Sequence, residues 1–141
     1  FTPFTKAGGF TNLHGDAYSK KANEFTLVSI IIESKEGLDN LDEILEVDEI
    51  DVVYFGAYDL SQALEVPGQT RHASVLKEIE QGVRKVNDKG KYAGGFVAQS
   101  KDDIKWLLDM GMRFITYEVD SSIVYKAVNE VTDWFGNELK K

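Results

Sequence analysis

Four stretches of mostly apolar residues recur along the chain, and a segment with helical spacing follows each of them. The stretches comprise residues 26–33, 50–56, 92–98 and 114–117. The first two are rich in β-branched and aromatic residues and show little alternation between apolar and polar positions. Such runs indicate strands that are buried on both faces, as in parallel sheets. The pattern therefore predicts four parallel strands.

Apolar residues spaced by three and four positions follow the strands and predict amphipathic helices. A short helical turn at residues 59–64 and a surface loop at 65–73, which could act as a lid, separate the second strand from a long helix. The residues suited to begin or end helices are Asp39 or Asn40, Ser74, Ser100 and Ser121 at starts, and Gly90 and Gly111 at ends. The positions expected to face inward are Leu41, Ile44, Leu45, Leu76, Ile79, Val83, Val86, Ile104, Leu107, Leu108, Val124, Ala127, Val128, Val131 and either Trp134 or Phe135.

A strand and a helix repeated four times with short connections imply an α/β fold with right-handed crossovers. The 141 residues suffice for one domain with a core of its own. Residues 1–25 are expected to form an N-terminal loop and a helix, and residues 26–141 the four βα units. The chain does not begin with Met, and we expect it to be processed or part of something longer.

Two carboxylates follow the first two predicted strands. Glu33 ends the first apolar run, and Asp59 lies just beyond Gly56 at the end of the second. Ligands of α/β folds bind at the carboxyl ends of parallel strands, so two acids in these places suggest a divalent metal site. On the residues alone, a helix cap or a pairing with lysine accounts better for each acid.

Two motifs around these acids resemble those of the metal-dependent aldolases of the HpcH/HpaI type, which cleave or form 4-hydroxy-2-oxo acids with pyruvate as the common product. The separation of 26 residues between Glu33 and Asp59 also fits that family. With the resemblance, metal ligation becomes the favoured interpretation of both acids. The matching residues are Ile32, Glu33, Ser34, Glu36, Gly37, Asn40, Ile44, Asp51, Val52, Val53, Gly56, Asp59, Leu60 and Ser61.

The resemblance implies that the chain forms the last four βα units of a (β/α)₈ TIM barrel, which is half of that barrel. Four strands cannot close on themselves, so we expect an N-terminal half barrel, an omitted segment or a second copy of this chain to complete it, and a homo-oligomer is expected. A half barrel is expected to expose an apolar inner face. The residues expected to form part of that face are Val28, Ile30, Val52, Tyr54 and Phe114.

The resemblance also implies a division of roles at the site. Glu33 and Asp59 are the expected ligands of Mg²⁺ or Mn²⁺, with Co²⁺ as a further possibility, and the substrate is a small 2-oxo acid formed from pyruvate and an aldehyde. The family's general base, a His, and its substrate-binding Arg belong to the first half of the barrel, so the catalytic residues of this chain are unknown. The expected substrate-binding residues are Gly56, Ala57, Tyr58, Asp59, Phe96 and Val97. The last two are placed at the pocket mouth by their position in the third strand, where core packing is the default interpretation.

Several positions depart from the family pattern. Ile31 replaces a usual Gln, Ala57 replaces a usual Pro, and the bulky Tyr58 replaces a small residue; the Arg expected near residues 6–9 has no clear equivalent. These departures support a second hypothesis, in which the protein is a weakened or non-catalytic relative that binds a small carboxylate or serves as a scaffold. A different lyase or hydrolase of the wider barrel superfamily is a third.

Charge and cysteine content narrow the function classes further. The formal net charge of −8 argues against nucleic acid and anionic membrane surfaces as partners, because both require a basic patch. The chain has no cysteine, which excludes thiolate ligands and fits a reducing cytoplasm. No apolar run approaches the roughly 20 residues of a membrane span. The two histidines, His14 and His72, are expected at the surface and are not equivalents of the family's base.

Overall fold

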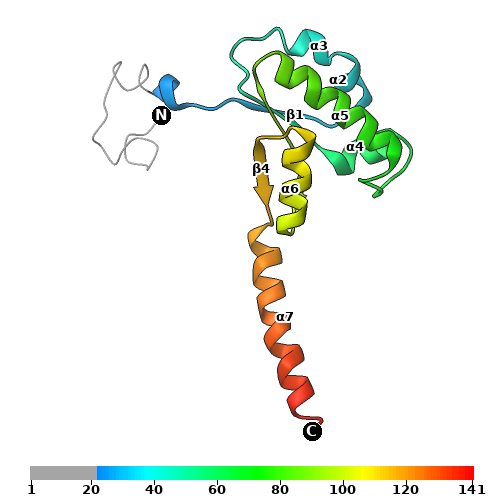
Figure 1. The fold of residues 1–141 in the computed structure, drawn as a ribbon, viewed down its shortest axis with the longest axis vertical. Coiled ribbons are helices and arrows are strands. Elements are labelled where there is room, and N and C mark those ends of the chain that lie inside the picture. The colour runs from blue at the N-terminus through cyan, green and yellow to red at the C-terminus, as the bar shows by residue number, and fades with distance from the viewer. Residues whose placement is uncertain (1–21) are drawn as a thin grey trace.

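The computed structural model describes residues 22–141, of which residues 22–25 are helical. The predicted loop at residues 1–10 and most of the predicted helix at 11–25 lie outside the described part. The remaining elements, in chain order (Figure 1), are β1 (Ser29–Ile32), α2 (Lys35–Asp39), α3 (Leu41–Ile44), β2 (Val52–Phe55), α4 (Ala57–Ala63), α5 (Ala73–Asp88), β3 (Tyr92–Ala98), α6 (Lys101–Met110), β4 (Phe114–Tyr117) and α7 (Asp120–Glu138).

Within residues 22–141 the four strands form one parallel sheet in the order β1-β2-β3-β4, which confirms the predicted strands and their direction. Strand β1 is shorter than predicted. Its first residue, Ser29, lies opposite Val52, where β2 begins, and the Val28 carbonyl accepts the Asp51 and Val52 N–H groups, both at 3.0 Å, so the pairing with β2 begins at Val28 and not at residue 26. Strand β3 carries one extra residue between Gly94 and Val97 relative to β4, which makes a β-bulge.

Helices cover one face of the sheet and enclose the core. Helix α5 supplies a row of fully buried residues, and Phe55 of β2 packs beneath it. A Cβ added at Gly82 would lie 2.5 Å from the Phe55 ring, so only glycine lets helix and ring approach this closely. The core between the helices and the sheet contains buried apolar residues from both layers. They include Ile32, Leu41, Leu45, Val53, Phe55, Val75, Ile79, Val83, Val86, Ala93 and Leu107.

The opposite face of the sheet is open over β1 and β4. Ile31, Tyr54 and Phe114 lie in one row across the strands, and Ile31 is 58% exposed. The prediction that the first strand is buried on both faces is therefore wrong, because the described helices cover only one face. Two residues assigned to the uncovered face are also corrected, since Ile30 packs against the core and Val52 is buried.

Helix starts differ from several predictions. Ser100 caps α6 as expected, because its hydroxyl accepts the Asp103 N–H at 3.1 Å. Helix α5 begins earlier than predicted, with the His72 ring in place of Ser74 as its cap. Helix α2 was not predicted, and Ser34 caps it by accepting the Gly37 N–H. Leu108 is exposed, whereas Val75, which the apolar spacing missed, is fully buried.

Helix α7 leaves the sheet and projects away from it (Figure 1). None of its residues is buried, although Val124, Val128 and Val131 lie at helical spacing. The prediction that this side faces inward is wrong for the described chain, because no element of residues 22–119 covers it. At its base the buried carboxylate of Glu118 accepts hydrogen bonds from Ser122 and Lys126, which tie the first turns of the helix to the end of β4.

Candidate functional site

The carboxyl ends of β1 and β2 bring Glu33 beside the turn that begins α4. Ile32 pairs with Phe55, and the Ile32 carbonyl accepts the Gly56 N–H at 3.0 Å. A Cβ added at Gly56 would lie 3.0 Å from the Glu33 Cβ and 3.4 Å from its Oε2. Glycine at position 56 therefore leaves the room that the Glu33 side chain occupies.

A pocket of about 480 Å³ opens at this same edge of the sheet. All six residues predicted to bind substrate line it: Gly56, Ala57, Tyr58, Asp59, Phe96 and Val97. Asp59 lies in the first turn of α4, directly after the end of β2. The pocket thus joins the ends of β2 and β3, as the strand order requires.

Glu33 does not line the pocket, but its side chain lies next to Gly56, which is a lining residue. Within residues 22–141, neither the Glu33 nor the Asp59 carboxylate takes part in a side-chain hydrogen bond or an ion pair, so the described contacts give no support to a helix cap or a lysine partner. Both side chains belong to exposed residues. No group of three or more His, Cys, Asp or Glu gathers in the described part of the chain, so a cation held here would take its other ligands from elsewhere.

Phe96 is held in an unusual conformation at the bulge of β3. Its φ angle is +57°, a left-handed backbone that non-glycine residues seldom adopt. Two contacts fix it there: the Tyr54 hydroxyl donates to the Phe96 carbonyl at 2.7 Å, and the Phe96 ring meets Trp106 edge-on at 5.0 Å between centroids. Strain of this kind gathers at binding sites, where it aims a side chain or carbonyl into the pocket.

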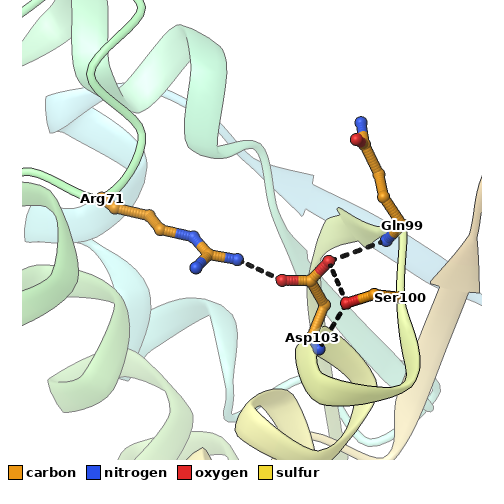
Figure 2. A network of polar contacts seen from close by, with 4 residues as sticks. All are labelled: Arg71, Gln99, Ser100 and Asp103. Atoms are coloured by element: carbon orange, nitrogen blue, oxygen red, sulfur yellow. Dashed lines mark hydrogen bonds and ion pairs between the residues drawn. The ribbon is translucent and has the colours of Figure 1, made fainter.

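Five further residues line the pocket, and four of them form a polar group that sequence analysis did not single out: Thr70, Arg71, Gln99 and Asp103. Arg71 reaches from the loop before α5 to Asp103, with 2.5 Å between Nη2 and Oδ1 (Figure 2). Its guanidinium also lies 4.5 Å from the centre of the Trp106 ring. The fifth residue is Tyr54.

Asp103 is the centre of this network (Figure 2). Its Oδ2 accepts the Gln99 N–H and the Ser100 hydroxyl, both at 3.0 Å, while Oδ1 accepts from Arg71. The Arg71 hydrogen bond, with those of Gln99 and Ser100, lowers the pKa of the Asp103 carboxyl below its ordinary value. The capping sequence Ser-x-x-Asp at 100–103 is visible in the sequence, but the contact with Arg71 joins residues far apart in the chain.

The loop that carries Arg71 is anchored at its start. Ser61 is fully buried in α4, donates its hydroxyl hydrogen to the Tyr58 carbonyl at 2.6 Å and accepts the Gly68 N–H at 2.9 Å. This loop was predicted as a possible lid, and it does border the pocket through Thr70 and Arg71. His72, at the end of the loop, is exposed as predicted and caps α5. His14 lies outside the described residues.

The chain matches the HpcH/HpaI aldolase/citrate lyase family over residues 6–127. It is 36% identical over 113 residues to a 2-keto-3-deoxy-L-rhamnonate aldolase of Shigella dysenteriae serotype 1 (strain Sd197), an alignment that covers 80% of this chain and 42% of that protein. The chain therefore spans less than half the length of this curated relative.

Solved structures agree with the fold. The crystal structure of the citrate synthase SbnG has a TM-score of 0.78 and 27% identity over 86% of this chain and 49% of that one. A HpcH/HpaI aldolase/citrate lyase family protein from Burkholderia cenocepacia J2315 has a TM-score of 0.80 over all of this chain and 52% of that one; at 22% identity this likeness concerns the fold alone.

The parallel sheet with helices on one face and a pocket at its carboxyl edge defines the class as an α/β protein, in which ligands usually bind at that edge. With the match over residues 6–127, the chain belongs to the HpcH/HpaI aldolase/citrate lyase family. Among the described residues, no helix is long and apolar enough to cross a membrane.

Proposed function

We propose that this chain provides the metal site of a divalent-metal-dependent aldolase, which cleaves or forms 4-hydroxy-2-oxo acids with pyruvate as the common product. The observation that carries the proposal is the placement of Glu33 and Asp59 after neighbouring parallel strands, with Asp59 inside a pocket lined by the six expected residues. Family membership supports carbon–carbon lyase chemistry, and the relative named for 2-keto-3-deoxy-L-rhamnonate supports a sugar-acid type of substrate.

The donor set fits a hard cation such as Mg²⁺, Mn²⁺ or Co²⁺, because Glu33 and Asp59 offer carboxylate oxygens that the described contacts leave open. When bound, the cation would polarise the keto oxygen of the substrate and stabilise the enolate. The chain's own contribution is to hold the two acids at one edge of the sheet. Gly56 keeps the space beside Glu33 clear, and α4 carries Asp59.

The turn at the start of α4 suits the carboxylate of the 2-oxo acid. The first bond of that helix runs from the Leu60 N–H to the Gly56 carbonyl at 2.9 Å, so the backbone N–H groups of Tyr58 and Asp59 precede the helical pattern. Both residues line the pocket, and their N–H groups are proposed to donate to an anionic oxygen of the substrate. Phe96 and Val97 would border the aldehyde end of the substrate.

We also propose that the chain acts as half of a (β/α)₈ barrel and works with an N-terminal half, a second copy or both. The partly uncovered face of the sheet and the projecting α7 support this assembly, because exposed apolar surfaces of this kind are covered in working proteins. The general base and a substrate-binding arginine would come from the completing half.

The test is Asp59→Asn in the complete protein, measured by pyruvate release from a 4-hydroxy-2-oxo acid with and without a chelator. The substitution removes one charge at nearly constant volume, so we expect a loss of about 10²–10³-fold in kcat. Cooperative unfolding should be nearly unchanged, because Asp59 is exposed and supports no core. Full activity of Asp59→Asn, or a wild type indifferent to chelator, would contradict the metal-dependent proposal.

Ile31 favours the second candidate, a weakened or non-catalytic relative that binds a small carboxylate. Its Cγ2 lies 3.5 Å from the position of a Cβ at Gly56, so an apolar group borders Glu33 where relatives usually carry Gln. Ile31→Gln separates the two candidates. In an active aldolase the substitution should be tolerated, and an increase in activity would show that Ile31 weakens the site; binding of pyruvate without turnover in both proteins would favour the second candidate.

A further inference from the structure

The polar residues that line the pocket include Arg71, whose guanidinium has N–H groups without a hydrogen-bond acceptor among the described residues. Among contacts within residues 22–141, Arg71 donates hydrogen bonds through Nη2 alone. Nη1 and Nε lie on a side chain that lines the pocket and is 60% exposed. A guanidinium has five N–H groups, so most of them remain available to a ligand.

Arg71 is also held in place before any ligand arrives. Asp103 fixes one edge of the guanidinium, Trp106 lies against its face, and Asp103 is itself fixed by the Gln99 N–H and the Ser100 hydroxyl. A donor held in this way loses little conformational freedom when it binds a ligand.

We propose that Arg71 is a specificity-determining residue that binds hydroxyl oxygens on the aldehyde portion of the substrate, and that Asp103 is its positioning residue. The inference rests on the proposed function, since it assigns the part of the substrate beyond the reacting carbons. Its chemical class is a polyhydroxylated tail, as in a sugar acid, in preference to an alkyl or an anionic tail.

Charge decides between hydroxyl and anionic tails. The positive charge of Arg71 is already paired with Asp103 at 2.5 Å, and Asp59 lines the same pocket. An anionic tail would have to compete with the Asp103 carboxylate for the guanidinium, whereas a neutral hydroxyl needs only the remaining N–H donors. Gln99 and Thr70 add groups that both donate and accept, which suits hydroxyls as well.

The kinetic experiment uses Arg71→Met in the complete protein, with pyruvate and aldehydes matched in carbon number. Glyceraldehyde is compared with propanal, and succinic semialdehyde with butanal. We expect kcat/KM for glyceraldehyde to fall by about 10–100-fold and that for propanal by less than about threefold, since only glyceraldehyde loses hydrogen bonds to a charged donor. Exchange of the pyruvate methyl protons, which needs no aldehyde, should stay unchanged. Arg84→Met, on α5 outside the pocket, is the matched control and should alter none of these values.

Asp103→Asn tests the positioning role. It should weaken glyceraldehyde use through KM more than through kcat and leave proton exchange intact, and Arg71→Lys should recover part of the activity lost in Arg71→Met. Equal losses for glyceraldehyde and propanal in Arg71→Met, or a larger loss for succinic semialdehyde than for glyceraldehyde, would overturn the assignment.

A binding measurement separates this inference from the proposed function. In a background in which every tryptophan except Trp106 is replaced by phenylalanine, Trp134 included, the fluorescence of Trp106 reports binding at the rim during titration with gluconate or hexanoate, which are equal in carbon number. We expect Arg71→Met to weaken gluconate binding by about tenfold and to leave hexanoate binding unchanged. That result would support the rim assignment even in a protein without aldolase activity. Equal effects on both ligands, or no effect on either, would overturn it.

Discussion

Helices α5 and α7 are long helices of 16 and 19 residues, and both carry apolar residues at helical spacing. In α5 the residues Val75, Ile79, Val83 and Val86 are fully buried, whereas in α7 no residue is buried. The spacing alone therefore indicates that a helix has an apolar side, but it does not identify the surface that covers that side. For α5 the surface is this chain's own sheet, and for α7 it is one that residues 22–119 do not supply.

The same substitution, valine to aspartate, should affect the two helices very differently. Val83 in α5 is 0% exposed and Val128 in α7 is 58% exposed. We expect Val83→Asp to lower the free energy of unfolding by at least about 3 kcal/mol, because it buries a carboxylate without a partner. Val128→Asp should change it by less than about 0.5 kcal/mol. Chemical denaturation followed by circular dichroism measures both.

Association is the second readout for this pair. If a partner covers α7, Val128→Asp should weaken assembly in light scattering while leaving the fold of the separate chain intact. Equal stability losses in the two variants would mean that α7 is covered within one chain, and unchanged assembly in Val128→Asp would remove α7 from the interface.

Replacing a glycine by alanine in each helix should change stability by a smaller amount. A Cβ at Gly82 would meet the Phe55 ring at 2.5 Å, whereas a Cβ at Gly136 would meet nothing within 4 Å among the described residues. We expect Gly82→Ala to destabilise the fold by about 1–3 kcal/mol through overpacking. Gly136→Ala should leave stability unchanged or raise it by up to about 1 kcal/mol, because alanine restricts the unfolded chain. Thermal unfolding distinguishes the two results, and a stabilising Gly82→Ala would show that the helix can move away from the sheet.

The smallest expected effect is at the base of α7. Hydrogen bonds from Lys126 and Ser122 hold the pKa of Glu118 below its ordinary value of 4.5. A lowered carboxyl pKa means that the folded state favours the charged form, so this contribution is complete at neutral pH and is lost as the pH falls below about 4.5. We expect the first turn of α7 to loosen over that range, as measured by NMR shifts of its amides. In Glu118→Gln this acid response should be missing, and an identical response in both proteins would assign it to other carboxyls.

The strand ends that border the pocket could be read from the sequence more directly than the loop and helix that complete its lining. Glu33, Gly56 and Asp59 follow strands, and the position of a strand end can be read from the end of an apolar run. Phe96 and Val97, in the third predicted strand, were expected at the pocket mouth with core packing as the alternative, and both line the pocket. Whether Glu33 and Asp59 share a cation stays a prediction.

Arg71 was missed for a physical reason. It lies in an irregular loop without a periodic signal, and its importance depends on Asp103 and Trp106, which approach it only when α6 packs beside the loop. The uncovered side of α7 was missed in a related way. Local spacing predicts a helix from its own residues, whereas the direction that the helix takes after Val119 depends on contacts at a single end.

Because the described contacts hold α7 at its base, a small rotation there produces a large displacement at its far end. At 1.5 Å per residue, its 19 residues extend roughly 28 Å from the pivot at Glu118. A rotation of about 10° at the pivot would move the far tip by about 5 Å, nearly the pitch of one helical turn. Glu118 lies directly after β4, in the same parallel sheet whose neighbouring strands end at the pocket. If the completing half or a second copy covers α7, as proposed, a small shift of that strand end would be transmitted through Glu118 to the surface that covers the helix.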